Sequence, residues 1–254
     1  MKPLSYILRD MNMTGRIIII NAVVWLTVTL VNVIIAPQNI AVTALDLPGG
    51  LGLVVRPWTL LTYMFTQTDV WHCLFNMLWL LWFGLMLEHC TSRRHVMATY
   101  LLSGLGGAIT FIITTLVLGN GQYSMLEGSS AAVMGVVALT GCTIPNHRVN
   151  LFLLGNIKVK WVAAATILLF ALGSGGNNIA SQAAHIGGVI AGLIIAWYQH
   201  AKRPRYDKMP AAHTLSSADA RAELDELLDK VKRSGYNSLS GNERRRLIEL
   251  SHNI

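Results

Sequence analysis

A serine pair, two histidines and an asparagine stand in stretches of this chain that are otherwise almost wholly apolar. Ser129 and Ser130 open the run "GSSAAVMG", His185 lies in "SQAAHIGGVIAG", and His72 and Asn76 lie in "VWHCLFNMLWLL". Ionisable and strongly polar groups are costly in an apolar environment, so their presence there indicates function. A serine hydroxyl becomes a good nucleophile when a positioned imidazole accepts its proton. Ser130 and His185 are therefore candidates for a nucleophile and its general base.

The second apolar run supplies candidates for binding an oxyanion. His72 and Asn76 are four residues apart, so both project from one face of a helix. Acyl transfer needs hydrogen-bond donors that face the oxyanion of the tetrahedral intermediate. The Asn76 amide, the His72 imidazole and the backbone N–H of Ser130 could supply them. The carboxylate nearest in sequence, Glu127, lies outside the apolar run, which favours a Ser-His dyad over a triad with a buried aspartate.

Each of these residues also has a structural interpretation. A lone serine in a membrane helix usually bonds to its own helix backbone, and a lone histidine or asparagine often joins helices. Their occurrence at one depth, which follows if six membrane-spanning helices alternate in direction, favours the catalytic interpretation.

The composition indicates that the chain lies in a bilayer. Of its 254 residues, 53% are hydrophobic and only 13% are charged, and the mean hydropathy is +0.47. The net charge is +7, but the basic residues form short clusters between apolar stretches. Membrane topology explains this pattern better than nucleic-acid binding does. Cys73, Cys90 and Cys142 are too few for a disulfide framework or a zinc site, so we expect them in the core and expect no metal or cofactor.

A membrane-spanning helix needs about 20 mostly apolar residues. Six stretches qualify, and breaker residues such as Pro37, Gly119 and Pro145 separate them. They are residues 17–36, 70–87, 96–118, 128–144, 159–173 and 180–200. The first could instead be a signal peptide, since "VTA" at residues 42–44 resembles a cleavage site, but its apolar run is longer than such peptides normally have.

Basic residues set the expected orientation. If six helices alternate, the basic clusters of the loops and of both termini fall on one side, which is then cytoplasmic. The loop at residues 37–69 lies outside. His72, Ser130 and His185 then lie within roughly 10 Å of the outer boundary, at 1.5 Å per residue, and can meet at one depth.

Small residues surround two of these side chains. His185 shares its helix face with Gly188 and Gly192, and Gly128, Ala131 and Gly135 flank Ser130 in the same way. Small residues allow helix backbones to approach closely in a membrane. The fourth and sixth helices can therefore bring the Ser130 hydroxyl within hydrogen-bond reach of the His185 imidazole.

The chain changes character after residue 200. We expect a membrane domain at residues 1–200, a linker with prolines at 201–215 and a cytoplasmic helical hairpin at 216–254. Ser216 with Asp219, and Ser240 with Glu243, form capping-box patterns, and Leu224, Leu227, Leu228 and Val231 follow at helical spacing until Gly235. The basic run at residues 244–246 fits a solvated face better than a lipid contact, and no pattern in the hairpin points to a particular partner.

These residues, in this order, resemble the rhomboid family of intramembrane serine proteases. "HCLFN" (residues 72–76), "GSS" (128–130) and "AHIGGVIAG" (184–192) match the family's HxxxN, GxS and AHxxGxxxG motifs, and "RPWTLLTYMF" (56–65) resembles the segment before its second helix. The resemblance implies an all-α membrane protein with a six-helix bundle. It also implies Ser130 as nucleophile, His185 as base, and His72 and Asn76 as oxyanion donors, with no cofactor.

Three positions depart from the family pattern. Ala131 follows the nucleophile, where glycine is usual. Met134 occupies a position that often holds an aromatic residue packed on the catalytic histidine. Thr59 follows Trp58, where the family often has arginine, and Arg56 comes two residues before that tryptophan. None of these changes removes a reacting group, so they bear on rate and substrate preference.

We therefore expect a protease that cuts other proteins' transmembrane helices near the outer face of the membrane, most simply the inner membrane of a bacterium, with both termini cytoplasmic. Its partners are transmembrane substrates and the bilayer, not nucleic acid. An inactive rhomboid-like protein that binds membrane clients is the alternative. A small-solute transporter fits less well, because no repeat is evident and the polar residues lie near one face.

Overall fold

The computed structural model describes residues 11–34, 40–119, 124–151, 155–173, 179–202, 217–240, 242–243, 246–247 and 250. The chain divides into two compact units, Met1–Lys202 and Arg203–Ile254. The described part of each unit is mainly helical.

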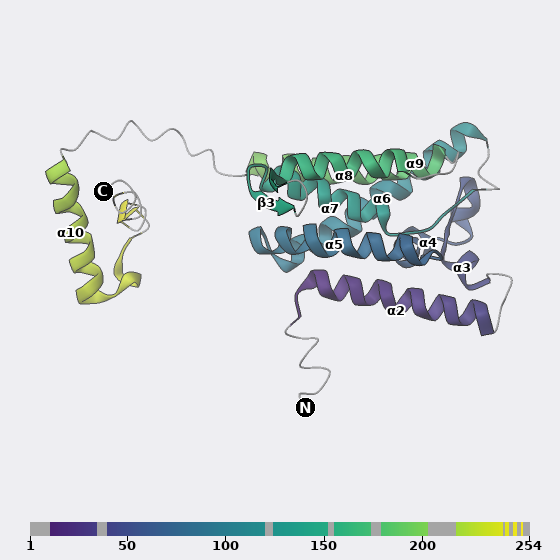
Figure 1. The fold of residues 1–254 in the computed structure, drawn as a ribbon, viewed down its shortest axis with the longest axis horizontal. Coiled ribbons are helices and arrows are strands. Elements are labelled where there is room, and N and C mark those ends of the chain that lie inside the picture. The colour runs from purple at the N-terminus through teal and green to yellow at the C-terminus, as the bar shows by residue number, and fades with distance from the viewer. Residues whose placement is uncertain are drawn as a thin grey trace, which may run out of the picture. The chain divides into compact units, whose positions relative to one another are not determined.

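The first unit contains the apolar helices (Figure 1). Four are long and apolar enough to cross a membrane: α2 (Met13–Ile34), α5 (Val70–Cys90), α6 (Arg93–Leu118) and α9 (Ile179–Lys202). Two more are apolar but shorter, α7 (Ser130–Thr143) and α8 (Val159–Gly173). These helices occupy the six stretches expected from hydropathy. The count of six membrane spans stays a prediction, since α7 and α8 are shorter than the usual span.

Local signals determine where the long helices begin and end. Asp69 caps α5, its carboxylate accepting a hydrogen bond from the backbone N–H of His72 at 2.6 Å. Ser92 caps α6 through the N–H of His95. Helix α6 ends at Gly119, whose φ of +67° is the left-handed conformation that glycine adopts without strain. Pro37, the expected stop of the first helix, lies outside the described residues.

Residues 40–65, which the sequence presents only as a loop, form a series of short elements between α2 and α5. It contains α3 (Ile40–Leu45), β1 (Leu47–Pro48), η1 (Gly50–Val54), α4 (Thr59–Thr62) and η2 (Tyr63–Phe65). Three side chains bind the last carbonyls of α3: Arg56 donates to Thr43, Trp58 to Ala44 at 2.9 Å and Thr62 to Leu45 at 2.7 Å. These bonds fix the end of α3, from which β1 continues.

The strand β1 connects this segment to the turn before α7. It pairs antiparallel with β2 (Met125–Leu126), with Leu47 opposite Leu126 and Pro48 opposite Met125. The Gly49 N–H extends the pair by donating to the carbonyl of Ser124 at 2.8 Å. The start of α7 is thereby tied to the loop between α2 and α5.

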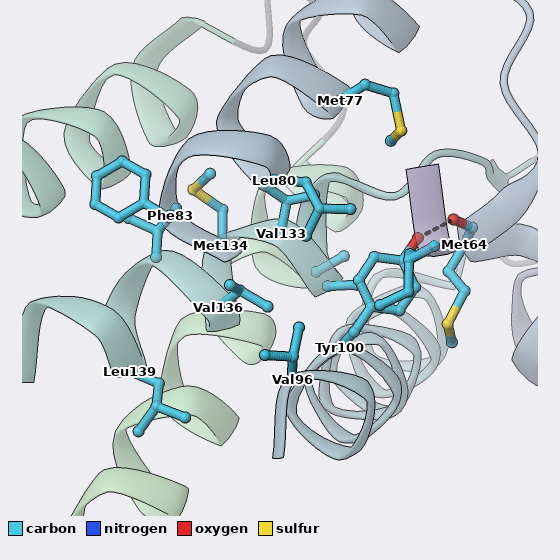
Figure 2. Packing of buried hydrophobic residues seen from close by; sticks show 14 of the residues in the cluster. Met64, Met77, Leu80, Phe83, Val96, Tyr100, Val133, Met134, Val136 and Leu139 are labelled. Atoms are coloured by element: carbon cyan, nitrogen blue, oxygen red, sulfur yellow. Dashed lines mark hydrogen bonds between the residues drawn. The ribbon is translucent and has the colours of Figure 1, made fainter. Parts of the chain in front are cut away.

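Helix α7 is the centre of the first unit. It contacts α5, α6, α8 and α9, and every residue from Ser130 to Gly141 is buried. Figure 2 shows Val133 and Met134 of α7 beside Leu80 and Phe83 of α5. On another side of the core, the Tyr100 hydroxyl of α6 donates to the carbonyl of Met64 at 2.9 Å (Figure 2).

Glycines allow α7 and α9 to approach at backbone distance. A Cβ at Gly188 would lie 2.0 Å from the carbonyl oxygen of Ala131, and one at Gly192 would lie 2.4 Å from that of Gly135. Neither position could hold a side chain without moving a helix. The predicted small-residue contact between the two helices is confirmed.

The cysteine prediction is correct for one residue and wrong for two. Cys73 is buried, whereas Cys90 and Cys142 are exposed. Cys90 is the last residue of α5 and Cys142 the last but one of α7. The helices leave the packed core at these ends, so an apolar sequence setting does not ensure burial there.

A second two-stranded sheet, β3 (Arg148–Leu151) with β4 (Gly155–Lys158), connects α7 to α8. Like the first, it carries no hydropathy signal of its own.

The second unit contains α10 (Ser217–Ser234) and η4 (Tyr236–Ser238). Leu227, Leu239 and Leu250 form its small core. The Ser240–Glu243 capping box is present, because the N–H of Ser240 donates to Glu243 and the N–H of Glu243 donates to the Ser240 hydroxyl. Ser216 of the other predicted box lies outside the described residues. Leu228, expected on the apolar face, is 47% exposed.

Candidate active site

Ser130 and His185 meet in the interior of the first unit. Ser130 is the first residue of α7, and His185 lies in the first third of α9. The Ser130 Oγ and the His185 Nε2 are 2.7 Å apart, and the two residues are 4% and 6% exposed. That distance is a short hydrogen bond, which suits proton transfer from hydroxyl to imidazole.

The close packing of α7 on α9 brings these two side chains together. Gly188 lies three residues after His185, on the same face, and its Cα faces the backbone of Ala131. A larger residue at this position would move the imidazole away from the hydroxyl. The small residues identified in the sequence therefore set the distance between the Ser130 Oγ and the His185 Nε2.

The His185 ring has an aromatic neighbour from α8. Phe170 approaches it edge-on, with ring centroids 6.3 Å apart and planes at 80°. The sequence offered Met134 as a side chain that could pack on this histidine. Met134 is fully buried and lies beside Phe83 in the core (Figure 2). The aromatic contact on His185 comes instead from Phe170, a residue that the sequence did not single out.

The second histidine faces the turn that leads to Ser130. Gly128 has a φ of +106°, and a Cβ there would lie 3.0 Å from the Cε1 atom of His72. Only glycine both adopts this conformation without strain and leaves room for the ring. The His72 imidazole and the "GSS" turn are thus in direct proximity.

Asn76 belongs to a buried polar network. Its amide nitrogen donates to Gln67 at 3.1 Å, Gln67 in turn donates to Asn21 at 3.4 Å, and Asn21 donates to the Tyr100 hydroxyl at 3.1 Å. Asn76 itself is fully buried, and its amide oxygen has no partner within the described ranges.

The network reaches residues that sequence reasoning missed. Gln67 and Asn21 are fully buried polar residues, and each contributes one link between Asn76 and α6. A polar residue in the apolar run 17–36 was a visible signal for Asn21. Gln67 lies in the loop before α5, where polar residues are common, so its type gave no signal.

The two adjacent serines have different surroundings. The Ser129 side chain is fully buried, and its hydroxyl interacts with that of Tyr100. Its carbonyl accepts from the N–H of Val133 at 2.9 Å, as in the first turn of a helix. Of the pair, only Ser130 contacts an imidazole. Across the described residues, no group of three His, Cys, Asp or Glu side chains could hold a metal ion.

Comparison with known proteins identifies the class. The model of the rhomboid domain matches residues 55–202, which include all four candidate site residues. The chain therefore belongs to the rhomboid family. A second model, for a family of unknown function (DUF6576), matches residues 216–253.

Individual relatives share this region. The chain is 31% identical to RHOMBOID-like protein 2 of Arabidopsis thaliana over 149 residues, which is 59% of this chain and 44% of that protein. It is 29% identical to the rhomboid protease GlpG of Yersinia pseudotuberculosis over 146 residues, which is 56% of this chain and 48% of the relative. The chain thus matches less than half the length of these curated relatives.

Proposed function

We propose that this protein is an intramembrane serine protease in which Ser130 is the nucleophile and His185 the general base. The observation that carries the proposal is the 2.7 Å contact between the Ser130 Oγ and the His185 Nε2 in a buried setting. Family membership supports it, and one of the similar proteins is named a rhomboid protease.

In the proposed reaction, His185 accepts the proton of the Ser130 hydroxyl while Oγ attacks the carbonyl carbon of the scissile peptide bond. The imidazolium then donates that proton to the leaving amine, and an acyl-enzyme remains on Ser130. Water, deprotonated by His185, hydrolyses the ester and restores the hydroxyl. Each proton taken by His185 is returned, so the cycle needs no cofactor.

The proposed oxyanion donors are the His72 imidazole, the Asn76 amide and the Ser130 N–H. His72 adjoins the turn before Ser130, which supports its part. The Gln67 side chain accepts from the Asn76 amide and would hold its orientation. The second hydrogen of that amide group is then available to the oxyanion.

The substrates proposed are transmembrane helices of other proteins, cut near the outer face of the membrane. A helical peptide bond is shielded by its own hydrogen bonds, so cleavage requires local unwinding, which glycine, proline or small residues favour. The basic-inside pattern supports the proposal of six spans with both termini cytoplasmic, as in a bacterial inner membrane. In this arrangement residues 216–254 would lie in the cytoplasm, behind a linker at 201–215.

The proposal is tested by cleavage in proteoliposomes. The substrate is a single-span protein with a Gly-Ala pair in the outer third of its helix, and the enzyme is the wild type, Ser130→Ala or Ser129→Ala. We expect cleavage by the wild type and by Ser129→Ala, and none by Ser130→Ala. Equal cleavage by the two alanine variants would refute the assignment of Ser130.

The alternative, a rhomboid-like protein that binds membrane clients without cutting them, makes a different prediction. It would leave substrates intact, and the wild type and Ser130→Ala would retain them equally in pull-down from detergent. Asn76, His72, Ser130 and His185 are all present, which favours the protease.

A further inference from the structure

Two carboxyl groups lie opposite each other beside the turn that carries Ser130. In the β1–β2 pair, Leu47 is opposite Leu126, so extending the antiparallel register by one position would pair Asp46 with Glu127, and the charge of Glu127 does act on Asp46. Directly opposite residues have Cβ atoms about 4.5–5.5 Å apart, and like charges there are destabilising. Such a pair calls for a compensating group.

Among the described residues, no donor satisfies all the oxygens of these two carboxyl groups. Asp46 is 5% exposed, and its Oδ1 is buried with no hydrogen-bond partner among the described residues. The Oε2 of Glu127 is likewise buried and without a partner there. The other oxygen, Oε1, accepts from the Thr68 hydroxyl at 2.5 Å. A buried acceptor without a donor is costly, and a single proton held between the two carboxyl groups would supply the missing donor.

The charged groups around the pair do not replace that proton. Arg56 faces Asp46, but its guanidinium donates to the carbonyl of Thr43, which lies at the end of α3. His72 and Asp69 lie at the start of α5, and the charges of Glu127 and Asp69 both act on the His72 ring. Burial, the largest cause, and the charge of Glu127 together raise the pKa of the Asp46 carboxyl to about 8, against the opposing effect of Arg56.

We propose that Asp46 and Glu127 share one proton and that the resulting O–H···O⁻ hydrogen bond positions the turn that carries Ser130. Asp46 is held at the end of α3, whose carbonyls are bound by Arg56, Trp58 and Thr62. Glu127 immediately precedes Gly128, which packs on the His72 ring. The shared proton thus connects the fixed end of α3 to the turn at Gly128, which lies against His72 and leads to Ser130.

The effect on turnover rests on the proposed function. When the proton leaves for bulk water at alkaline pH, two facing carboxylates repel, β1 separates from β2, and Gly128 loses its position against His72. With a pKa of about 8, turnover by the wild type should fall about tenfold between pH 7 and pH 9 if only the protonated pair is competent. Asp46 and Glu127 are positioning residues, because neither touches the reacting atoms.

The first test does not depend on catalysis. Infrared spectra of the full chain in liposomes are recorded for the wild type and Asp46→Asn at pH 7 and pH 10. The difference spectrum should show the C=O band of one protonated carboxylic acid at pH 7 and lose it at pH 10. Absence of this band from the pH 7 difference spectrum would overturn the proposal, whether or not the protein is a protease.

The second test is the pH profile of labelling by a fluorophosphonate. Asp46→Asn and Glu127→Gln each keep a neutral donor between the strands, so both should retain the wild-type rate at pH 7 and lose the alkaline decline. Glu127→Ala should be slow at every pH. Asp69→Asn, the matched control, alters an exposed carboxylate near His72 and should keep the decline. An unchanged decline in the double variant Asp46→Asn, Glu127→Gln would refute the role of the pair, whereas a wild type that never reacts would refute the proposed function instead.

Discussion

A single methyl group at Gly188 should separate the Ser130 Oγ from the His185 Nε2. The Cβ of Gly188→Ala would lie 2.0 Å from the carbonyl oxygen of Ala131. A carbon and a carbonyl oxygen approach to about 3.3 Å, so α9 must move from α7 by about 1.3 Å. His185 lies three residues before Gly188 on the same face and moves with it.

The consequence for the site follows from its geometry. A displacement of this size lengthens the 2.7 Å contact between Ser130 and His185 to about 4 Å, beyond hydrogen-bond reach. A misplacement of 1 Å can cost about a hundredfold in rate, and overpacking costs about 1–3 kcal/mol of stability. We therefore expect a hundredfold slower reaction and a lower melting temperature.

The assay measures both quantities on the same samples. Fluorophosphonate labelling gives the rate, and thermal unfolding in detergent gives the stability. Gly192→Ala meets the oxygen of Gly135 at 2.4 Å, two turns from His185, and should lose stability with a smaller loss of rate. Ile194→Ala changes an exposed side chain of α9 and should alter neither. A wild-type labelling rate in a folded Gly188→Ala variant would refute the claim that the close packing of α7 on α9 sets the distance between Ser130 and His185.

Three further predictions concern the oxyanion donors, the turn and the second unit. Asn76→Ala should lower turnover by about ten- to a thousandfold in a cleavage assay. Gln67→Leu should lower turnover less, because this change removes only the partner that orients the Asn76 amide. A wild-type rate for Asn76→Ala would mean that the oxyanion is bound elsewhere. Gly128→Ala places a methyl 3.0 Å from His72 and strains a φ of +106°, so it should slow labelling, and unaltered labelling would contradict the proximity of the turn and the ring. The hydrogen bonds to Lys230 and Ser240 lower the pKa of Glu243 to about 2. The stabilisation by the Glu243 carboxylate is therefore complete above the ordinary pKa of about 4.3 and is lost as the pH falls through about 2. Glu243→Gln should thus weaken amide-exchange protection in the second unit at pH 7, and should weaken it progressively less below about pH 4.

Hydropathy and spacing predicted the apolar helices and the meeting of Ser130 with His185. The prediction succeeded because a membrane imposes long apolar runs, and because Gly188 and Gly192 recur at helical spacing opposite Ala131 and Gly135. These signals are local in the sequence, so they can be recognised without a structure.

Features that depend on contacts between distant segments could not be predicted. Two-residue strands such as β1 and β2 show no periodicity, so nothing in the sequence places Asp46 opposite Glu127. The bonds from Asn76 through Gln67 to Asn21 join three separate elements. The exposure of Cys90 depends on where α5 leaves the core.

The most direct test of the central claim is labelling of the purified wild type with a fluorophosphonate, followed by mass-spectrometric mapping of the modified residue. We predict modification at Ser130, its loss in Ser130→Ala and His185→Ala, and its retention in Ser129→Ala. Modification at another serine, equal labelling of His185→Ala, or no labelling of a folded wild type would contradict the account.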